Sequence, residues 1–389
     1  MFSSRTNWHR SPNRLTEALE SHRKSGNPIF DLSISNPTEC GIIYPEQDIL
    51  SSLSHRHTLS YHPSSQGLLS AREAVAQYYR EKSIDVDPED IFLTASTSEA
   101  YSLLFKLLCN RDEHILVPQP SYPLFEYLAQ VSDVHLLSYH LFYDHGWHID
   151  VESIRSTITS STKALVIVSP HNPTGMFLKK EEYQQLQEIA RLHNVALIVD
   201  EVFLDYPFHD DPTRVGTTVS TSEVLTFTLN GISKSCGLPQ MKLGWMVIGG
   251  ERTVTLEARG RLEILCDTYL SVNTPVQIAL LELFRCGKSI QYQILSRVKS
   301  NYEFLQGVLC SPSPVSLLES EGGWYAILKV PRTKSDEEWA MELLNEYGVY
   351  LFPGYFFDLQ NEGYLVVSLL TQSEVFVSAI NNLIHHISI

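Results

Sequence analysis

Short apolar runs alternate with stretches of helical periodicity between about residues 65 and 250, and this alternation limits the possible folds more than any other feature. Most runs are near-continuous and rich in β-branched residues, as expected for strands covered on both faces. The expected strands are IFLTA (91–95), HILVP (114–118), VHLLSY (134–139), KALVIVS (163–169), VALIVDEVF (195–203), VLTFTL (224–229) and WMVIGG (245–250). Helical patterns at residues 68–79, 98–108 and 181–192 lie between several of them. Such alternation predicts an α/β fold with a mostly parallel sheet in a three-layer arrangement.

The pattern changes after residue 250, where long helical segments replace the regular alternation. The expected elements are helices at 251–265, 275–309, 336–347 and 373–386, with strand-like runs GGWYAILKV and YLVVSLL among them. We therefore predict a large domain over residues 45–275. A smaller α+β domain is expected from both termini, residues 1–44 plus 276–389, with the helix at about 275–309 as the link.

The composition narrows the classes of protein that this chain can belong to. Its 389 residues are 43% hydrophobic, which is enough for a large core and for more than one domain. A formal net charge of -16 argues against nucleic acid as a partner, because that affinity depends on Lys and Arg. We expect no signal peptide and no membrane span, because the amino terminus lacks an apolar segment and no apolar run reaches about 18 residues. The six cysteines form no CxxC pair and fit a cytoplasmic protein.

Polar residues follow several of the expected strands at their carboxyl ends. Ligands of open α/β sheets bind at this edge, so we treat these residues as one candidate site. The set comprises Ser96, Thr97, Ser98, Tyr122, Asn172, Asp200, Ser233 and Lys234.

Two members of this set carry charge. Asp200 ends the apolar run VALIV, where a carboxylate is suited either to pair with a protonated ring nitrogen or to cap the strand. Lys234 follows VLTFTLNGIS, and a lysine at the edge of a buried sheet is able to lose its proton and attack a carbonyl. Taken alone, Lys234 is more typical of a surface lysine.

The neutral members also have two interpretations each. Residues 96–98 precede a helix, so they are suited to bind an anion or simply to cap that helix. Asn172 lies in the turn SPHNPTG, and its amide is a donor for a phenolic oxygen. Tyr122, in PQPSYP, offers either core packing or a stacking face for a planar ring.

The joint pattern resembles the class I/II aminotransferases, which are pyridoxal-phosphate enzymes of the aspartate aminotransferase fold (fold type I). The resemblance covers nearly the whole chain and is carried, in the family's order, by YHPSSQG, TASTSEA, PQPSYP, SPHNPTG, DEVF, SKSCGLPQMKLGW, GGWY and FPGYFF. It implies that Lys234 forms the Schiff base with pyridoxal 5′-phosphate and moves the proton between the substrate Cα and the cofactor C4′.

The resemblance also implies roles for the other residues of the set. Asp200 would pair with the pyridinium nitrogen, which makes the ring an electron sink. Asn172 would bind the ring hydroxyl, and Tyr122 would stack on the ring. The phosphate would be held by Ser96, Thr97, Ser98 and Ser233. Tyr61 matches the tyrosine that reaches the phosphate of the neighbouring subunit, which implies a homodimer with shared sites.

Three departures concern the cofactor. Phe203 stands where many relatives carry a tyrosine, and its missing hydroxyl implies a higher pKa of the Schiff base. Lys242 stands where an arginine usually clamps the phosphate, and a lysine supplies charge without the bidentate fork. Gly231 replaces a frequent phosphate-binding serine, so phosphate binding should depend more on Thr97, Ser98 and Tyr61.

A fourth departure concerns the substrate. The family usually carries an arginine in an R-x-S motif that binds the substrate α-carboxylate, and the strand YLVVSLL places Val366 there. No arginine follows Arg332. Another basic group, Arg261, Arg259 or Lys242, would then take over, which is the alternative we favour. Otherwise the substrate is an amine without an α-carboxylate, or the chain binds cofactor and catalyses little.

We therefore predict an aminotransferase that moves an amino group between a small-molecule amino donor and a 2-oxo acid by ping-pong chemistry. A pyridoxal-phosphate lyase or decarboxylase on the same fold is the main alternative, because the cofactor-site residues are shared by these reactions. A cofactor-responsive regulatory module is less favoured, since the chain is acidic and carries no added DNA-binding region.

Overall fold

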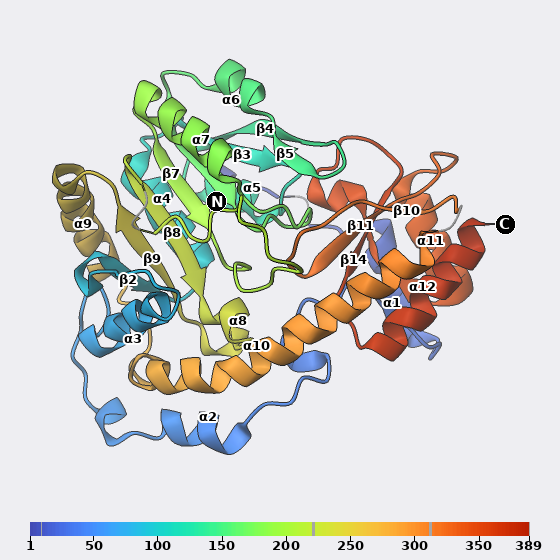
Figure 1. Ribbon diagram of the computed structural model, residues 1–389, viewed down its shortest axis with the longest axis horizontal. Coiled ribbons are helices and arrows are strands. Elements are labelled where there is room, and N and C mark those ends of the chain that lie inside the picture. Colours follow the sequence, from blue (N-terminus) through green and yellow to red (C-terminus); the bar gives the residue numbers. More distant parts are fainter. Residues whose placement is uncertain (9, 220–221, 311–312, 389) are drawn as a thin grey trace.

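A mixed eight-stranded sheet forms the centre of the structure, a computed structural model that describes residues 1–8, 10–219, 222–310 and 313–388 (Figure 1). Its strand order is β2-β9-β8-β7-β6-β3-β4-β5. The strands are β2 (Ile91–Thr94), β3 (His114–Gln119), β4 (His135–Tyr143), β5 (Trp147–Ile149), β6 (Thr162–Val168), β7 (Ala196–Asp200), β8 (Thr226–Gly231) and β9 (Gly244–Gly249). Strands β8, β7, β6, β3 and β4 pair in parallel, whereas β9, β2 and β5 are antiparallel to their neighbours. The predicted mostly parallel sheet is confirmed.

Apolar side chains of the central strands serve two separate cores because successive residues of a strand face opposite sides. In β7, Leu197 and Val199 belong to one core cluster and Ile198 to the other. Helices on the two faces provide the partners: α3 (Leu69–Arg80), α4 (Thr97–Leu108), α5 (Leu124–Val131), α6 (Val151–Thr157), α7 (Lys180–His193) and α9 (Arg252–Asp267). The near-continuous apolar runs of the sequence therefore reflect burial on both faces.

All seven predicted strands form, and two details differ from the prediction. The run 195–203 stops being a strand at Asp200, because the Asp200 carboxylate accepts a hydrogen bond from the Val202 amide (3.1 Å) and the chain turns. Strand β5 was not expected, since it has only three residues and is defined by its antiparallel pairing with β4.

A second, antiparallel sheet has the order β10-β11-β14-β13. Its strands are β10 (Ser316–Leu317), β11 (Tyr325–Lys329), β13 (Phe352–Pro353) and β14 (Tyr364–Ser368). Beside it, β1 (Phe30–Asp31) pairs in parallel with β12 (Val349–Tyr350), so both ends of the chain meet here. The accompanying helices are α1 (Arg14–Lys24), α11 (Asp336–Tyr347) and α12 (Ser373–Ile387). This arrangement fits a smaller unit built from both termini, while the boundaries at residues 45 and 275 stay a prediction.

Helix α10 (Thr274–Val308) has 35 residues and runs from the large sheet to the second sheet (Figure 1). The Asn273 side chain caps its first turn and Pro275 occupies a position where its missing N–H costs nothing. Helix α2 (Glu46–Leu53) lies along it, and the short α8 (Ile232–Ser235) contacts it after β8. The predicted linking helix is thus present within one residue at each end.

Six short 3₁₀ turns complete the described elements: Ser4–Thr6, Pro37–Glu39, Arg56–Leu59, Pro88–Asp90, Pro239–Met241 and Gly354–Phe357. In the part of the chain that the structure describes, no helix combines the length and apolar character that crossing a membrane requires.

Candidate active site

One cavity of about 340 Å³ collects most of the predicted site residues. Parallel strands β6, β7 and β8 end at the same edge of the sheet, so the residues that follow them converge. The predicted residues that line the cavity are Thr97, Ser98, Tyr122, Asn172, Asp200, Phe203, Ser233 and Lys234. Residues of the second sheet close the opposite side.

Lys234 lies in α8, immediately after β8, and its side chain is enclosed by aromatic rings. Its Nζ lies 4.5 Å from the centre of the Trp324 ring and 5.5 Å from that of Phe203. The Tyr206 hydroxyl donates to the Lys234 carbonyl oxygen (2.6 Å) and fixes the backbone. Burial lowers the pKa of Lys234 to about 8, and the Asp200 carboxylate partly opposes this shift. A pKa of about 8 leaves about one amine in ten neutral at pH 7, far more than for an ordinary lysine, which suits a nucleophile.

Asp200 is 8% exposed at the end of β7. Its carboxylate accepts hydrogen bonds from the Tyr101 hydroxyl (3.0 Å) and the Val202 amide (3.1 Å). Burial raises the pKa of Asp200 to about 6, while these two donors and Lys234 lower it. Because burial disfavours its charged form, a cation placed beside the Asp200 carboxylate would stabilise the ionised carboxylate.

The side-chain oxygen of Asn172 is buried and has no hydrogen-bond partner among the described residues. Leaving a buried polar atom without a hydrogen bond costs about 1–3 kcal/mol of stability, so the Asn172 amide is suited to bind a polar atom of a ligand. A rotation of the amide by 180° would present its NH₂ group instead of its oxygen to that ligand. Asn172 lines the same cavity as Lys234 and Asp200.

Residues 96–98 divide between the two roles considered for them. The Ser96 hydroxyl accepts from the Glu99 amide (3.1 Å) and caps α4, and Ser96 does not line the cavity. Thr97 and Ser98, the first residues of α4, do line it. The start of a twelve-residue helix with two hydroxyls favours an anion at this end of the cavity.

Two other predicted residues lie outside the cavity. Lys242 is exposed and adopts a left-handed backbone (φ 51°) just before β9. Tyr61 is 73% exposed and lines a different hollow with His62 and Tyr269. The structure of one chain therefore does not bring either of them to Lys234.

The basic residues considered as substitutes for the missing arginine also lie elsewhere. Arg261 is exposed and pairs with Glu257 one turn earlier in α9 (2.6 Å), while Arg259 pairs with Glu89. Val366 itself is fully buried in β14, where it pairs with Ile327 and Phe352. Within one chain, the expectation that Arg259, Arg261 or Lys242 takes over the carboxylate finds no support.

The sequence analysis missed Trp324, which covers Lys234. Its ring packs edge-on against Phe203 and Tyr206, with centroid separations of 5.3 Å in both cases. Trp324 comes from the segment before β11, and the run GGWY gave the only signal for it. Other missed residues of the cavity are Ser35, Tyr101, Phe125, Tyr325, Phe352, Phe356 and Phe357.

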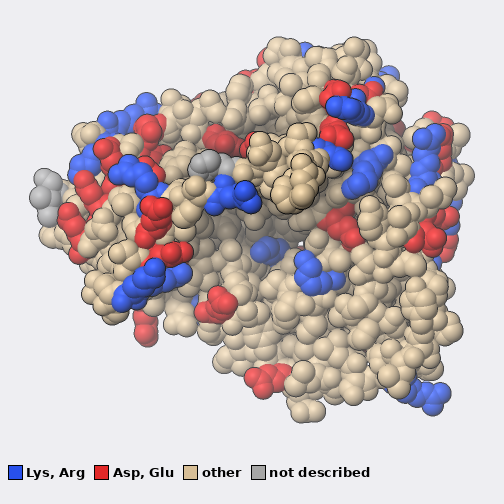
Figure 2. Space-filling model, turned by 180° about the vertical axis from the view of Figure 1, so that it is seen from behind, with Lys and Arg blue, Asp and Glu red and all other residues tan. Residues whose placement is uncertain are grey.

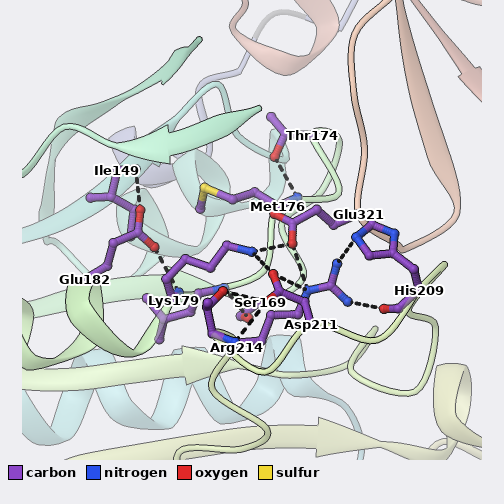
Figure 3. A network of polar contacts seen from close by, with 12 residues as sticks. Ile149, Ser169, Thr174, Met176, Lys179, Glu182, His209, Asp211, Arg214 and Glu321 are labelled. Carbon is purple, nitrogen blue, oxygen red and sulfur yellow. Dashed lines mark hydrogen bonds and ion pairs between the residues drawn. The ribbon is translucent and has the colours of Figure 1, made fainter. Parts of the chain in front are cut away.

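An ion-pair network holds the segment that precedes Trp324 (Figure 3). The Glu321 carboxylate accepts from Lys179 Nζ (2.5 Å) and Arg214 Nε (2.8 Å), and Lys179 also reaches Asp211 (2.8 Å). Lys179 immediately precedes α7 and Arg214 lies between β7 and β8, whereas Glu321 precedes β11. The network therefore joins the two sheets on the side of the cavity where Trp324 lies.

Backbone contacts reinforce this junction. The Glu321 amide donates to the Gly175 carbonyl (3.2 Å), and the Phe208 amide donates to the Glu321 carbonyl (2.9 Å). Gly175 has φ +72°, and a Cβ there would lie 1.8 Å from the Ser320 hydroxyl oxygen. Only glycine permits this approach of the SPHNPTG turn to the second sheet.

The face seen in Figure 2 is hollowed near its centre, and several Lys and Arg side chains stand in and around the hollow. This local gathering of positive charge contrasts with the net charge of -16 for the whole chain.

Comparisons with known proteins agree with this geometry. The family described as Aminotransferase class I and II matches residues 29–379. The glutamate-pyruvate aminotransferase AlaA of Haemophilus influenzae is 28% identical over 372 residues, which cover 94% of this chain and 92% of that protein. The tyrosine aminotransferase of Mus musculus is 28% identical over 372 residues, with 92% and 81% coverage.

Two solved structures extend the comparison. An aminotransferase from Escherichia coli has a TM-score of 0.85 and 26% identity, and the match covers 100% of this chain and 98% of that one. Alanine aminotransferase from Pyrococcus furiosus has a TM-score of 0.89 with 23% identity, 100% coverage of this chain and 99% of that chain, a likeness of fold alone.

Proposed function

Because this chain belongs to the class I and II aminotransferase family, and is a pyridoxal-phosphate-dependent aminotransferase, we propose that Lys234 binds its cofactor covalently and moves the proton of the transfer. The observation that carries this assignment is a buried lysine of lowered pKa in one cavity with Asp200 and the unsatisfied Asn172 oxygen. Nothing in the comparisons favours the lyase or decarboxylase alternative.

The residues of the cavity fit the cofactor. Asn172 offers a polar group without a partner, Asp200 offers a carboxylate that a cationic ring nitrogen would stabilise, and Thr97 and Ser98 offer a helix start for a phosphate. When bound, pyridoxal phosphate supplies an electron sink for the negative charge left on the substrate carbon.

Lys234 then serves as general base and acid. Its neutral amine takes the proton from the substrate Cα, and its ammonium delivers a proton at C4′ of the cofactor. Trp324 and Phe203 limit the positions open to Nζ, and the bond from Tyr206 fixes the backbone below it. A lysine restricted in this way serves both carbon atoms with little reorganisation.

The surrounding residues orient and bind. Asp200, held by Tyr101 and Val202, keeps its carboxylate directed for a ring nitrogen, and Asn172 hydrogen-bonds the ring hydroxyl. Tyr122, which lines the cavity and is 47% exposed, covers one ring face. Ser233 adds a hydroxyl near the phosphate end.

We further propose a homodimer in which Tyr61 of the partner subunit reaches the phosphate. Tyr61 is strongly exposed and lies away from the cavity of its own chain, which supports a role in a second copy. Lys242, exposed beside the start of β9, supplies charge at the phosphate end. All six cysteines are unpaired, which supports the proposed cytoplasmic location.

The test is a half-reaction with purified holoenzyme. An amino donor should remove the visible absorption of bound cofactor, and a 2-oxo acid should restore it. Lys234→Ala should lose covalent cofactor and turnover, whereas Lys288→Ala, at an exposed residue paired with Glu81, should retain both. Release of ammonia without any need for a 2-oxo acid would contradict transfer.

A further inference from the structure

The cavity offers a single cation to a ligand. Of the described residues that line it, Lys234 is the only one with a basic side chain, and the proposed function assigns that amine to the cofactor. The only acidic residue of the lining, Asp200, is assigned to the ring nitrogen. The other charged groups of the described residues lie outside the lining, so within one chain the part of the cavity left for a substrate is uncharged.

One further arginine deserves comparison because it extends from α10 toward the amino-terminal segment that contains Ser35. The Arg297 guanidinium donates to the carbonyl oxygens of Cys40 (3.2 Å) and Leu370 (3.5 Å). Arg297 does not line the cavity. Its two contacts join the amino-terminal segment at Cys40 to the residues that follow β14. It therefore supplies no charge to a ligand beside Lys234.

Aromatic rings make up the wall opposite the sheet edge. Phe352 lies 5.9 Å from Phe356 and 5.8 Å from Phe357 between ring centroids, and Tyr325 lies 5.9 Å from Phe357. Phe125 and Tyr122 add to the apolar lining. A wall of this kind favours a flat or apolar substituent through burial and ring contacts.

A carboxylate placed here would lose water without gaining an ionic partner. Burial of an unpaired charge is strongly unfavourable, and neutral donors compensate only in part. Among the neutral donors of the lining, the hydroxyls of Ser35 and Tyr325 already hydrogen-bond each other. At β14, Val366 is fully buried between Ile327 and Phe352 and does not line the cavity, so this strand supplies no charge there.

We propose, on the basis of the proposed function, that the amino donor is an arylalkyl or similar apolar primary amine whose amine-bearing carbon carries no carboxylate. The amine gives its nitrogen and two electrons to the 2-oxo acid of the established activity, so the products are an aldehyde and an amino acid. The 2-oxo acid meets the same uncharged wall, and therefore binds weakly, with a high KM.

A matched pair of donors tests this inference on wild-type holoenzyme. 2-Phenylethylamine and phenylalanine share the same ring and chain and differ only in the carboxylate. The rate at which each removes the cofactor's visible absorption, followed over donor concentration, should give a second-order rate constant at least about tenfold higher for the amine. Phenylacetaldehyde formation confirms transfer rather than simple binding.

Variants of the wall add a second readout. Phe356→Ala should raise the concentration of 2-phenylethylamine needed for half-maximal rate by about tenfold, because an aromatic contact with the half-buried Phe356 ring is lost. As a control, Tyr292→Ala removes a ring on α10 that is 73% exposed and outside the lining, and should leave this concentration unchanged. Equal effects of the two variants would contradict the aromatic wall as the binding surface.

The possible results separate this inference from the proposed function. If phenylalanine reacts as fast as or faster than the amine, the inference is overturned, transfer stands, and a cation from the partner subunit must reach the site. If arylalkyl amines and α-amino acids both fail to react although Lys234 holds the cofactor, the inference and the assigned transfer role both fail.

Discussion

The Nζ of Lys234 lies 4.5 Å from the centre of the Trp324 ring, although Lys234 follows a strand of the large sheet and Trp324 precedes a strand of the second sheet. An ammonium over an indole face is attracted to it, while burial disfavours the charge and Asp200 favours it. The pKa of Lys234, about 8, reflects burial, which lowers it, and the Asp200 carboxylate, which raises it. Any change that removes one of them should therefore shift the titration in a known direction.

Asp200→Asn should lower the pKa of Lys234 below about 8, because the carboxylate is the group that favours the charged amine. In protein freed of cofactor, the pH profile of borohydride-trapped aldehyde addition to Lys234 should move to lower pH. Turnover of the holoenzyme should fall by about 10² to 10³, since the ring nitrogen loses its ionic partner. Asp85→Asn, at an exposed site, is the control. A profile that moves to higher pH would contradict this assignment.

Phe203→Tyr should lower the pKa that governs the visible absorption of the bound cofactor. Phe203 is 5% exposed and packs edge-on against Trp324, so a hydroxyl added to its ring points within the site. A donor near the ring oxygen of the cofactor stabilises its negative form. Absorbance titration of wild type and variant measures the shift. An unchanged value would mean that residue 203 does not reach that oxygen.

Much of the fold was predictable because its signals are local. Continuous apolar runs specify strands buried on both faces, and Asp200 and Asn172 stand directly after such runs. Their convergence follows from the shared direction of β6 and β7, which needs no knowledge of long-range contacts. Strand β5 escaped prediction because its three residues carry too little pattern, and only pairing with β4 defines it.

The part of the site that was not predictable comes from long-range packing. Trp324 reaches Lys234 because the segment before β11 is held by Lys179 and Arg214, which lie far from it in sequence. No periodicity reports such a contact. Ser96 shows the converse, since capping and anion binding need the same residue types at a helix start and only geometry separates them.

Because we propose Lys242 for the phosphate end, Lys242→Asn should weaken cofactor binding by about five- to thirtyfold through the loss of one positive charge. Asparagine suits the left-handed backbone of this position, φ 51°, so little strain is added. Lys242→Arg keeps the charge and offers a bidentate fork, and should bind cofactor at least as tightly as wild type. Equilibrium titration of cofactor-free protein gives the three dissociation constants. Equal constants would exclude Lys242 from the phosphate site.

Glu321→Gln should destabilise the protein by about 1–3 kcal/mol, because the hydrogen bonds to Lys179 and Arg214 lose their charged acceptor while both cations stay partly buried. Urea unfolding at pH 7 measures this change. Turnover should fall as well, since Trp324 follows the released segment, whereas Glu319→Gln, two residues earlier and exposed, should alter neither quantity. Lost stability with unchanged turnover would show that the network does not position Trp324.

Glu201 predicts a dependence of stability on pH. Burial raises the pKa of Glu201 from 4.5 to about 7, although Thr217 and Thr218 donate to its carboxylate. The folded state therefore binds the proton of Glu201 more tightly than the unfolded state does. The protonated Glu201 contributes fully to the free energy of unfolding below about pH 4.5, and this contribution is lost as pH rises through about 7. Relative to wild type, the Tm of Glu201→Gln should be higher at pH 8 than at pH 5. A difference that does not vary with pH would contradict the raised pKa.

Helix α10 connects the elements around the two sheets, so a movement of the helix at one sheet is transmitted to the other. Its 35 residues form a rod about 52 Å long, which contacts α3 and α8 near the large sheet and α12 near the second sheet. A tilt of about 5° at one end displaces the other by about 4.5 Å over that length. A small rotation of α10 is therefore enough to change the width of the gap between Lys234 and the aromatic wall at Phe356.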